Sequence, residues 1–319
     1  MLLKKPSCII IGIHGLNNKV SKRLLIKWWK ASIQEGLKNA GYPPQAFKFE
    51  MSYWARRVYA KPLNPREKRE GHPLFLSRPY VPSSEIAGES TSQEIKPSLW
   101  GRLFRRTVNR VLISHDNEDE PEGERLPVLE QSFPDLGLYY ANKRVFSHRY
   151  GLRDLLRRDL AKMIRKHSGS RIMLIGHSMG SIIAFDVLGM YKIQIDVFAT
   201  MGSPLGFPTI KKKYAREHNL NLTKDPLIPT PNTIQSKWIN FADIEDIIAY
   251  FSPLSDHYRA NRHGVTVEDR MMSNDYTYKG NPHHHTVFGY LRSTETADLI
   301  ASFLKLRKTE QTDTQNDEH

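Results

Sequence analysis

Short apolar runs alternate with longer amphipathic segments in two parts of this chain. Residues 7–13, 171–175 and 197–201 are almost wholly apolar, which is the pattern of strands buried on both faces of a parallel sheet. In contrast, residues 21–39 and 152–164 carry large apolar side chains at every third or fourth position, as one face of an amphipathic helix does. Strands and helices in this order predict an α/β fold with a doubly wound, mostly parallel sheet.

The alternation breaks down between residues 56 and 149, where the sequence is rich in proline, charged and aromatic residues. We therefore predict that 56–149 is an insertion into one discontinuous core domain, formed by residues 1–55 and 150–307. The final residues, 308–319, are polar and are predicted to be disordered.

One stretch of the predicted insertion, residues 98–114, has the periodicity of a helix. Leucine, phenylalanine and valine lie on one side of this helix, and the other side carries Arg102, Arg105, Arg106 and Arg110. We expect the apolar side to pack on the sheet as a lid over Ser178. The basic side is typical of helices that lie on an anionic membrane surface, so such a surface is an expected partner.

Composition narrows the class of protein further. Of the 319 residues, 47 are Lys or Arg and 34 are Asp or Glu, and there is one cysteine. A single cysteine excludes an internal disulfide and a cysteine-rich zinc site. The first residues lack a secretory apolar stretch and no stretch is long enough to span a bilayer, so we expect a cytoplasmic protein, at most peripheral to a membrane. The formal net charge of +13 favours an anionic partner, but no nucleic-acid recognition motif appears and we expect no nucleic-acid binding.

Candidate chemistry appears in the pentapeptide Gly176-His177-Ser178-Met179-Gly180, which stands between an apolar run and a helical segment. A serine on a tight strand-to-helix turn has an exposed hydroxyl, and the turn requires small neighbours. A serine hydroxyl is a weak nucleophile that needs a base and a carboxylate to orient the base. Acidic residues follow the strand candidate at 238–241, and three histidines occupy 283–285, so the chain order is Ser, Asp, His.

In this order, these features resemble the α/β-hydrolase fold family, and within it the lipases and esterases. The other matching pieces are His14-Gly15 after the first apolar run and Gly202-Ser203-Pro204 after a later one. The resemblance covers about residues 7–55 and 150–307. It implies that Ser178 is the nucleophile and that the oxyanion hole consists of the backbone N–H groups of Leu16 and Met179.

The resemblance also implies an acid and a base. Asp246 precedes a short apolar stretch, as the family's catalytic acid does, and Asp243 is the alternative. His285 is implied as the base because Gly289-Tyr290-Leu291 follows at the family's usual spacing, and His283 and His284 remain alternatives. The three histidines also raise a metal site, but adjacent side chains in an extended loop alternate in direction, so we expect no metal and no cofactor.

These observations predict a serine hydrolase that cleaves carboxylic esters through an acyl-enzyme, with lipid or lysophospholipid as a candidate substrate. The same three groups would serve an acyltransferase or a thioesterase, because the motif specifies only the acyl-enzyme. A hypothesis of another class is a non-catalytic binding protein on a hydrolase fold.

Overall fold

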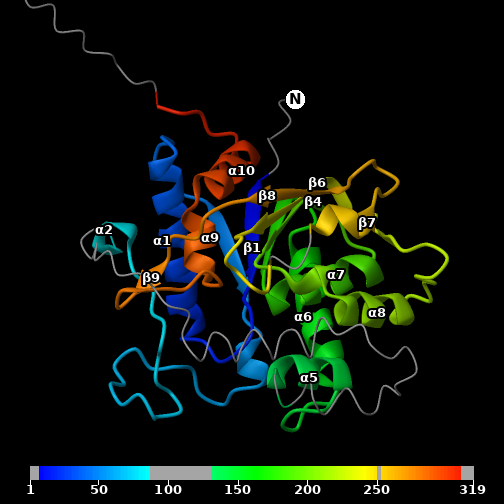
Figure 1. Ribbon diagram of the computed structural model, residues 1–319, viewed down its shortest axis with the longest axis horizontal. Coiled ribbons are helices and arrows are strands. Elements are labelled where there is room, and N and C mark those ends of the chain that lie inside the picture. The colour runs from blue at the N-terminus through cyan, green and yellow to red at the C-terminus, as the bar shows by residue number, and fades with distance from the viewer. Residues whose placement is uncertain (1–6, 87–130, 132, 250–252, 310–319) are drawn as a thin grey trace, which may run out of the picture.

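A central parallel sheet organises the molecule in the computed structural model, which describes residues 7–86, 131, 133–249 and 253–309 (Figure 1). Its six strands run in the order β2-β1-β3-β4-β6-β8, and every neighbouring pair is parallel. Their bounds are β1 (Cys8–Ile13), β2 (Lys48–Ser52), β3 (Arg171–His177), β4 (Ile195–Met201), β6 (Ile234–Ala242) and β8 (Val267–Met271). The predicted α/β class with a parallel sheet is therefore confirmed.

Helices cover both faces of this sheet, and each face has its own core (Figure 1). One layer consists of α1 (Lys22–Asn39), α9 (Val287–Arg292) and α10 (Thr294–Leu304). The other consists of α5 (Pro134–Ala141), α6 (Leu152–Lys166), α7 (Met179–Met190) and α8 (Pro208–Glu217). Successive side chains of a strand point to opposite faces, so Ile9 and Ile11 of β1 enter the core under α6 and α7, while Ile10 packs with α1 and α10.

The shorter elements lie outside the sheet. Two small strand pairs form between β5 (Ile228–Pro229) and β7 (Tyr258–Arg259), and between β9 (Thr277–Tyr278) and β10 (Asn281–Pro282). The remaining short helices are α2 (Ser83–Ile86), η1 (Ala55–Arg57), η3 (Pro204–Gly206) and η4 (Leu254–Asp256). None of the helices in the described ranges has the length and apolarity needed to cross a bilayer.

The strand order marks where a ligand is expected to bind. From β1 the chain moves to β2 on one side, and it then crosses to β3 on the other side of β1. At such a switch point the loops that follow the two strands diverge and leave a crevice at the carboxyl ends of the strands. The loops that follow β1 and β3 contain His14-Gly15 and Ser178, so the sequence motifs and the topology indicate the same edge of the sheet.

Three helices differ from the sequence-based expectation. The sequence pattern predicts no helix around residue 210, but α8 forms there and buries Ile210 and Tyr214, whereas Lys212 is exposed. In addition, α5 lies inside the predicted insertion, yet it packs on α6 and contributes Tyr139 to the core. The six-residue helix α9 is too short to show a periodicity in the sequence.

The predicted lid helix at 98–114, with Arg102, Arg105, Arg106 and Arg110, lies outside the described residues. Residues 310–319 of the predicted tail also lie outside them. The lid and its anionic membrane partner therefore stay predictions.

Candidate active site

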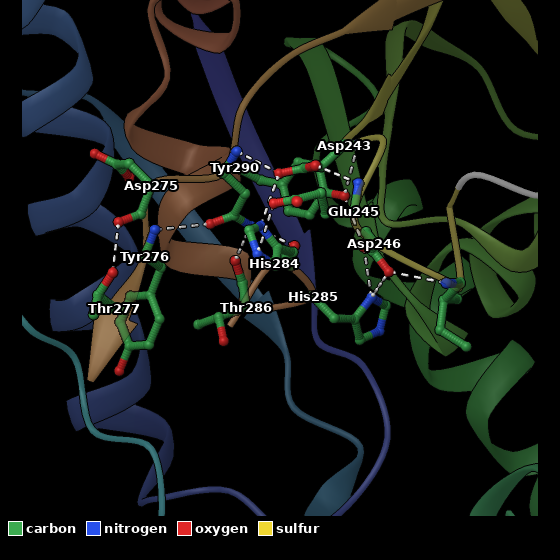
Figure 2. A network of polar contacts seen from close by, with 12 residues as sticks. Asp243, Glu245, Asp246, Asp275, Tyr276, Thr277, His284, His285, Thr286 and Tyr290 are labelled. Atoms are coloured by element: carbon green, nitrogen blue, oxygen red, sulfur yellow. Dashed lines mark hydrogen bonds and ion pairs between the residues drawn. The ribbon is translucent and has the colours of Figure 1, made fainter. Parts of the chain in front are cut away.

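The three residues predicted as nucleophile, acid and base come together beyond the carboxyl ends of the strands. Ser178 follows β3, Asp246 lies in the loop after β6, and His285 lies in the loop between β10 and α9. The Nε2 atom of His285 is 3.0 Å from Ser178 Oγ. Its Nδ1 atom is 2.9 Å and 2.8 Å from the two carboxylate oxygens of Asp246 (Figure 2). The His285 side chain is 30% exposed, whereas the Asp246 side chain is buried.

The turn at Ser178 has the strained backbone that the sequence motif predicts. Ser178 has φ 53° and ψ −127°, a combination that only glycine adopts without strain. The adjacent glycines are required by close packing, because a Cβ on Gly176 would lie 2.7 Å from the Cα of Ser181 and one on Gly180 would clash with the Ile13 carbonyl. The Ser178 N–H donates to the Met201 carbonyl at 3.0 Å, which ties the turn to the end of β4.

The acid loop places its two aspartates in different surroundings. The Asp246 carboxylate contacts His285 Nδ1. It also accepts hydrogen bonds from the Ile248 N–H at 3.0 Å and the Tyr290 hydroxyl at 2.7 Å. The structure therefore brings Asp246 to His285. Asp243, the alternative acid, is instead committed to the backbone: its two oxygens accept from the Glu245 N–H at 2.7 Å and the Asn274 N–H at 2.6 Å.

The three consecutive histidines take three different directions. His285 lies between Asp246 and Ser178, whereas His284 lies between Asp243 and Glu245, with N···O distances of 3.4 Å and 3.0 Å. His283 is held by its backbone N–H, which donates to the Tyr276 carbonyl at 2.9 Å. Burial, followed by the nearby charge of Arg78, lowers the pKa of His283 below its usual value.

Gly202 packs closely against both Asp246 and His285. Its φ is +55°, and a Cβ at this position would lie 2.9 Å from Asp246 Oδ2 and 3.1 Å from the His285 ring. Any side chain here would displace one of the two groups. The resemblance singled out Gly202-Ser203-Pro204 without a role, and the close approach of the carboxylate supplies one.

His177, the residue before Ser178, supports the backbone of His285. Its Nε2 is 2.9 Å from the His285 carbonyl oxygen, and the two rings lie 4.9 Å apart. Burial and the neighbouring His285 hold the pKa of His177 well below its usual value, so its ring is neutral and Nε2–H is the donor. The sequence motif does not indicate that His177 binds the His285 backbone, because any residue can occupy this position of the turn.

The loop after β1 brings the peptide predicted for the oxyanion hole to Ser178. A Cβ on Gly15 would lie 2.8 Å from the Ser178 Cβ, so the Gly15–Leu16 backbone lies against the serine. His14 Nδ1 is 2.9 Å from the Gly15 carbonyl oxygen, and His14 Nε2 accepts from the Ala55 N–H at 3.2 Å. Burial holds the pKa of His14 well below its usual value, so the neutral ring donates through Nδ1.

This hydrogen bond orients the Leu16 amide. The C=O and N–H groups of a trans peptide point in opposite directions, so the Leu16 N–H points away from His14. It makes no hydrogen bond to another residue in the described ranges. Met179 is the first residue of α7, where N–H groups have no acceptor within the helix. Both amides predicted for the oxyanion hole are thus available to a ligand.

Two side chains hold the same loop in place, one from α5 and one from the loop itself. The buried Asp135 of α5 accepts from the Asn17 N–H at 2.6 Å and from the Tyr59 hydroxyl at 2.8 Å. The Lys19 ammonium donates to the carbonyls of Leu16 and Asn17. Burial lowers the pKa of Lys19 to about 8. No local sequence pattern indicates this role of Asp135, because Asp135 lies 118 residues from its partner Asn17.

One group of side chains in the described part of the chain has the spacing of metal ligands. Asp243, Glu245 and His284 each offer one ligand atom, and these atoms lie within 4.8 Å of one another. Backbone N–H groups already occupy both oxygens of Asp243, and both ring nitrogens of His284 face carboxylates. These contacts within the protein account for the group, and the expected absence of a metal stays a prediction.

No family model matches the sequence, and no curated protein matches it. In structure the chain is similar to a lipase-esterase related protein from Clostridium acetobutylicum ATCC 824, with 9% identity, a TM-score of 0.35 and coverage of 94% of this chain and 95% of the other. It is also similar to the siderophore hydrolase EstA from Aspergillus nidulans, with 10% identity, a TM-score of 0.37 and coverage of 92% and 83%.

Proposed function

We propose that this chain is a serine hydrolase that cleaves carboxylic esters through an acyl-enzyme. The observation that carries the proposal is the continuous line of hydrogen bonds from Ser178 Oγ through both nitrogens of His285 to Asp246. A nucleophile, a base and an orienting carboxylate in this sequence are what activation of a serine hydroxyl requires. A binding protein would have no need of such an arrangement on a strained turn.

In the proposed reaction, Ser178 Oγ attacks the carbonyl carbon of the ester and His285 Nε2 takes the hydroxyl proton. Asp246 holds the Nδ1–H of His285 and stabilises the imidazolium that forms. The imidazolium then returns the proton to the departing alcohol, which leaves Ser178 acylated. A water molecule, activated by the same histidine, releases the acid and restores the serine.

The tetrahedral intermediate carries negative charge on the former carbonyl oxygen. The N–H groups of Leu16 and Met179 are the donors proposed for this oxygen, and the N-terminal end of α7 adds a favourable dipole. The Gly15 carbonyl belongs to the same peptide group as the Leu16 N–H, and it accepts a hydrogen bond from His14. This bond polarises the peptide and makes the Leu16 N–H a stronger donor. His14 therefore supports the oxyanion hole in this mechanism without touching substrate.

The proposal is tested with p-nitrophenyl butyrate, p-nitrophenyl palmitate and a butyryl thioester, together with a fluorophosphonate probe that labels activated serines. Hydrolysis of either ester and labelling at Ser178 are expected. A preference for the thioester would move the assignment to a thioesterase. Absence of both turnover and labelling would refute the hydrolase and favour a binding protein.

The acid gives a prediction that compares two aspartates in one loop. We expect Asp246→Asn to lower kcat by about 10⁴-fold, because an amide holds the histidine in the wrong tautomer. Asp243→Asn should cost far less, since Asp243 contacts His284 rather than His285. Steady-state kinetics of the two variants on p-nitrophenyl butyrate measure the difference, and the reverse ranking would transfer the role of the acid to Asp243.

A further inference from the structure

The hydroxyl of Tyr290 bridges the two ends of the acid loop. Tyr290 lies on α9, its side chain is fully buried, and its hydroxyl donates to Asp246 Oδ2 at 2.7 Å. The hydroxyl oxygen of Tyr290 also accepts a hydrogen bond from the backbone N–H of Asp243 at 3.2 Å. Figure 2 shows Tyr290 together with the two aspartates to which its hydroxyl is hydrogen-bonded.

This hydroxyl completes the set of contacts that fixes the carboxylate of Asp246. A carboxylate rotates about its Cβ–Cγ bond unless both oxygens are held. Here the Ile248 N–H holds Oδ1 at 3.0 Å and the Tyr290 hydroxyl holds Oδ2 at 2.7 Å. With both oxygens held, the carboxylate faces the Nδ1 atom of His285 at 2.8 Å and 2.9 Å.

Tyr290 donates to Asp246 as a neutral phenol. Burial, and then the charge of Asp246, raise the pKa of Tyr290 well above its usual value. The hydroxyl therefore keeps its proton at neutral pH and donates it to the carboxylate. The titratable groups that face it are Asp243 and Asp246 of the acid loop and His177 at the end of β3, whose ring centroid lies 6.4 Å away.

A second Asp–His pair holds the same two loops at a greater distance from Ser178. Asp243 pairs with His284 as Asp246 pairs with His285. Asn274 joins this second pair: its N–H donates to Asp243, and its amide nitrogen donates to the carbonyls of His284 and Thr286 at 2.7 Å and 2.8 Å. The Tyr290 hydroxyl connects the Asp243–His284 pair with the Asp246–His285 pair, since it contacts both aspartates.

We propose that Tyr290 is a positioning residue that orients Asp246 and reduces the negative charge that His285 experiences. The inference rests on the proposed function, since it gives Tyr290 a role in the same triad. A hydrogen bond to a carboxylate withdraws charge from it, so the Tyr290 hydroxyl weakens the pull of Asp246 on an imidazolium proton.

Tyr290→Phe removes this donor and keeps the ring. The Asp246 carboxylate then carries more negative charge toward His285, which favours the protonated imidazole. The midpoint of the His285 titration should therefore rise by about one pH unit, which corresponds to the energy of one hydrogen bond to a charged group. The acid limb of kcat/KM against pH should move by the same amount. We expect kcat at the optimum to fall about tenfold with KM unchanged, because Tyr290 does not touch substrate.

Two further variants separate positioning from loss of structure. Tyr276→Phe is the matched control, because Tyr276 is equally buried but its hydroxyl donates to the Pro79 carbonyl and does not touch Asp246. Tyr290→3-fluorotyrosine, introduced at this one position, makes the phenol a stronger donor. It should therefore shift the His285 titration in the opposite direction, to lower pH.

The experiment follows the His285 imidazole by ¹⁵N NMR of histidine-labelled protein over pH 4–9, alongside the pH profile of p-nitrophenyl butyrate hydrolysis. Opposite shifts in the two Tyr290 variants, and none in Tyr276→Phe, are expected. No shift in Tyr290→Phe, or an equal shift in Tyr276→Phe, would overturn the inference. The NMR titration needs no turnover, so a wild-type protein that neither hydrolyses esters nor reacts with a fluorophosphonate would refute the proposed function separately.

Discussion

In a Ser178→Ala variant, ester hydrolysis should fall by on the order of 10⁶-fold in kcat. The hydroxyl forms the covalent bond in the proposed mechanism, and no other group near His285 Nε2 replaces it. The fold should persist, because the Ser178 N–H, rather than its side chain, makes the bond to the Met201 carbonyl. Initial rates on p-nitrophenyl butyrate, fluorophosphonate labelling and far-UV circular dichroism measure the three parts of this prediction.

Ser181→Ala is a suitable control for the nucleophile. Ser181 is buried in the same turn, and its hydroxyl donates to the Ser178 carbonyl at 2.6 Å, but it makes no contact with His285. We expect this variant to label with the probe as wild type does. Labelling that survives in Ser178→Ala would show that another serine reacts, and the proposed function would lose its nucleophile.

The histidines provide the second large effect. We expect His285→Ala to lower kcat by a factor similar to that of Ser178→Ala, since the serine and its base act as a unit. His283→Ala and His284→Ala should retain most activity, because these side chains point to Tyr276 and to the Asp243–Glu245 pair. Parallel kinetics of the three single variants, with circular dichroism as a check of folding, give the comparison.

The same set of variants tests the metal hypothesis. Wild-type activity should be unchanged after treatment with EDTA, because the proposed chemistry uses only side chains and backbone amides. Activity lost in EDTA and restored by a divalent cation, together with a large effect of His284→Ala, would indicate instead that Asp243, Glu245 and His284 hold a metal needed for the reaction.

The sheet could be predicted because its strands are buried on both faces. Strands β1, β3 and β4 each contain a short run of mostly apolar residues, which is the pattern expected of a strand covered on both faces of a sheet. Helix α1 was predictable for a similar reason: Leu25, Trp29 and Ile33 recur at four-residue intervals behind the capping residue Ser21. These signals are local, so they can be identified without knowing the fold.

The site was predictable only where its residues follow such local elements. Ser178 follows a buried strand and precedes a helix, which is a contiguous pattern. The choice between Asp243 and Asp246 depends on the direction of each side chain in an irregular loop, and periodicity says nothing about such a loop. Tyr290 and Asp135 could not be assigned from sequence, because their partners lie 44 and 118 residues away.

The backbone of Ser178 has a consequence for selection at this position. A non-glycine residue held at φ 53° and ψ −127° costs about 1–3 kcal/mol, and glycine would relieve that cost. A library of variants sorted for thermal stability alone should therefore enrich glycine at position 178, while the same library sorted for ester turnover should retain only serine. Opposite preferences at one position, in two selections on one library, would mark Ser178 as a residue kept for turnover at a cost in stability.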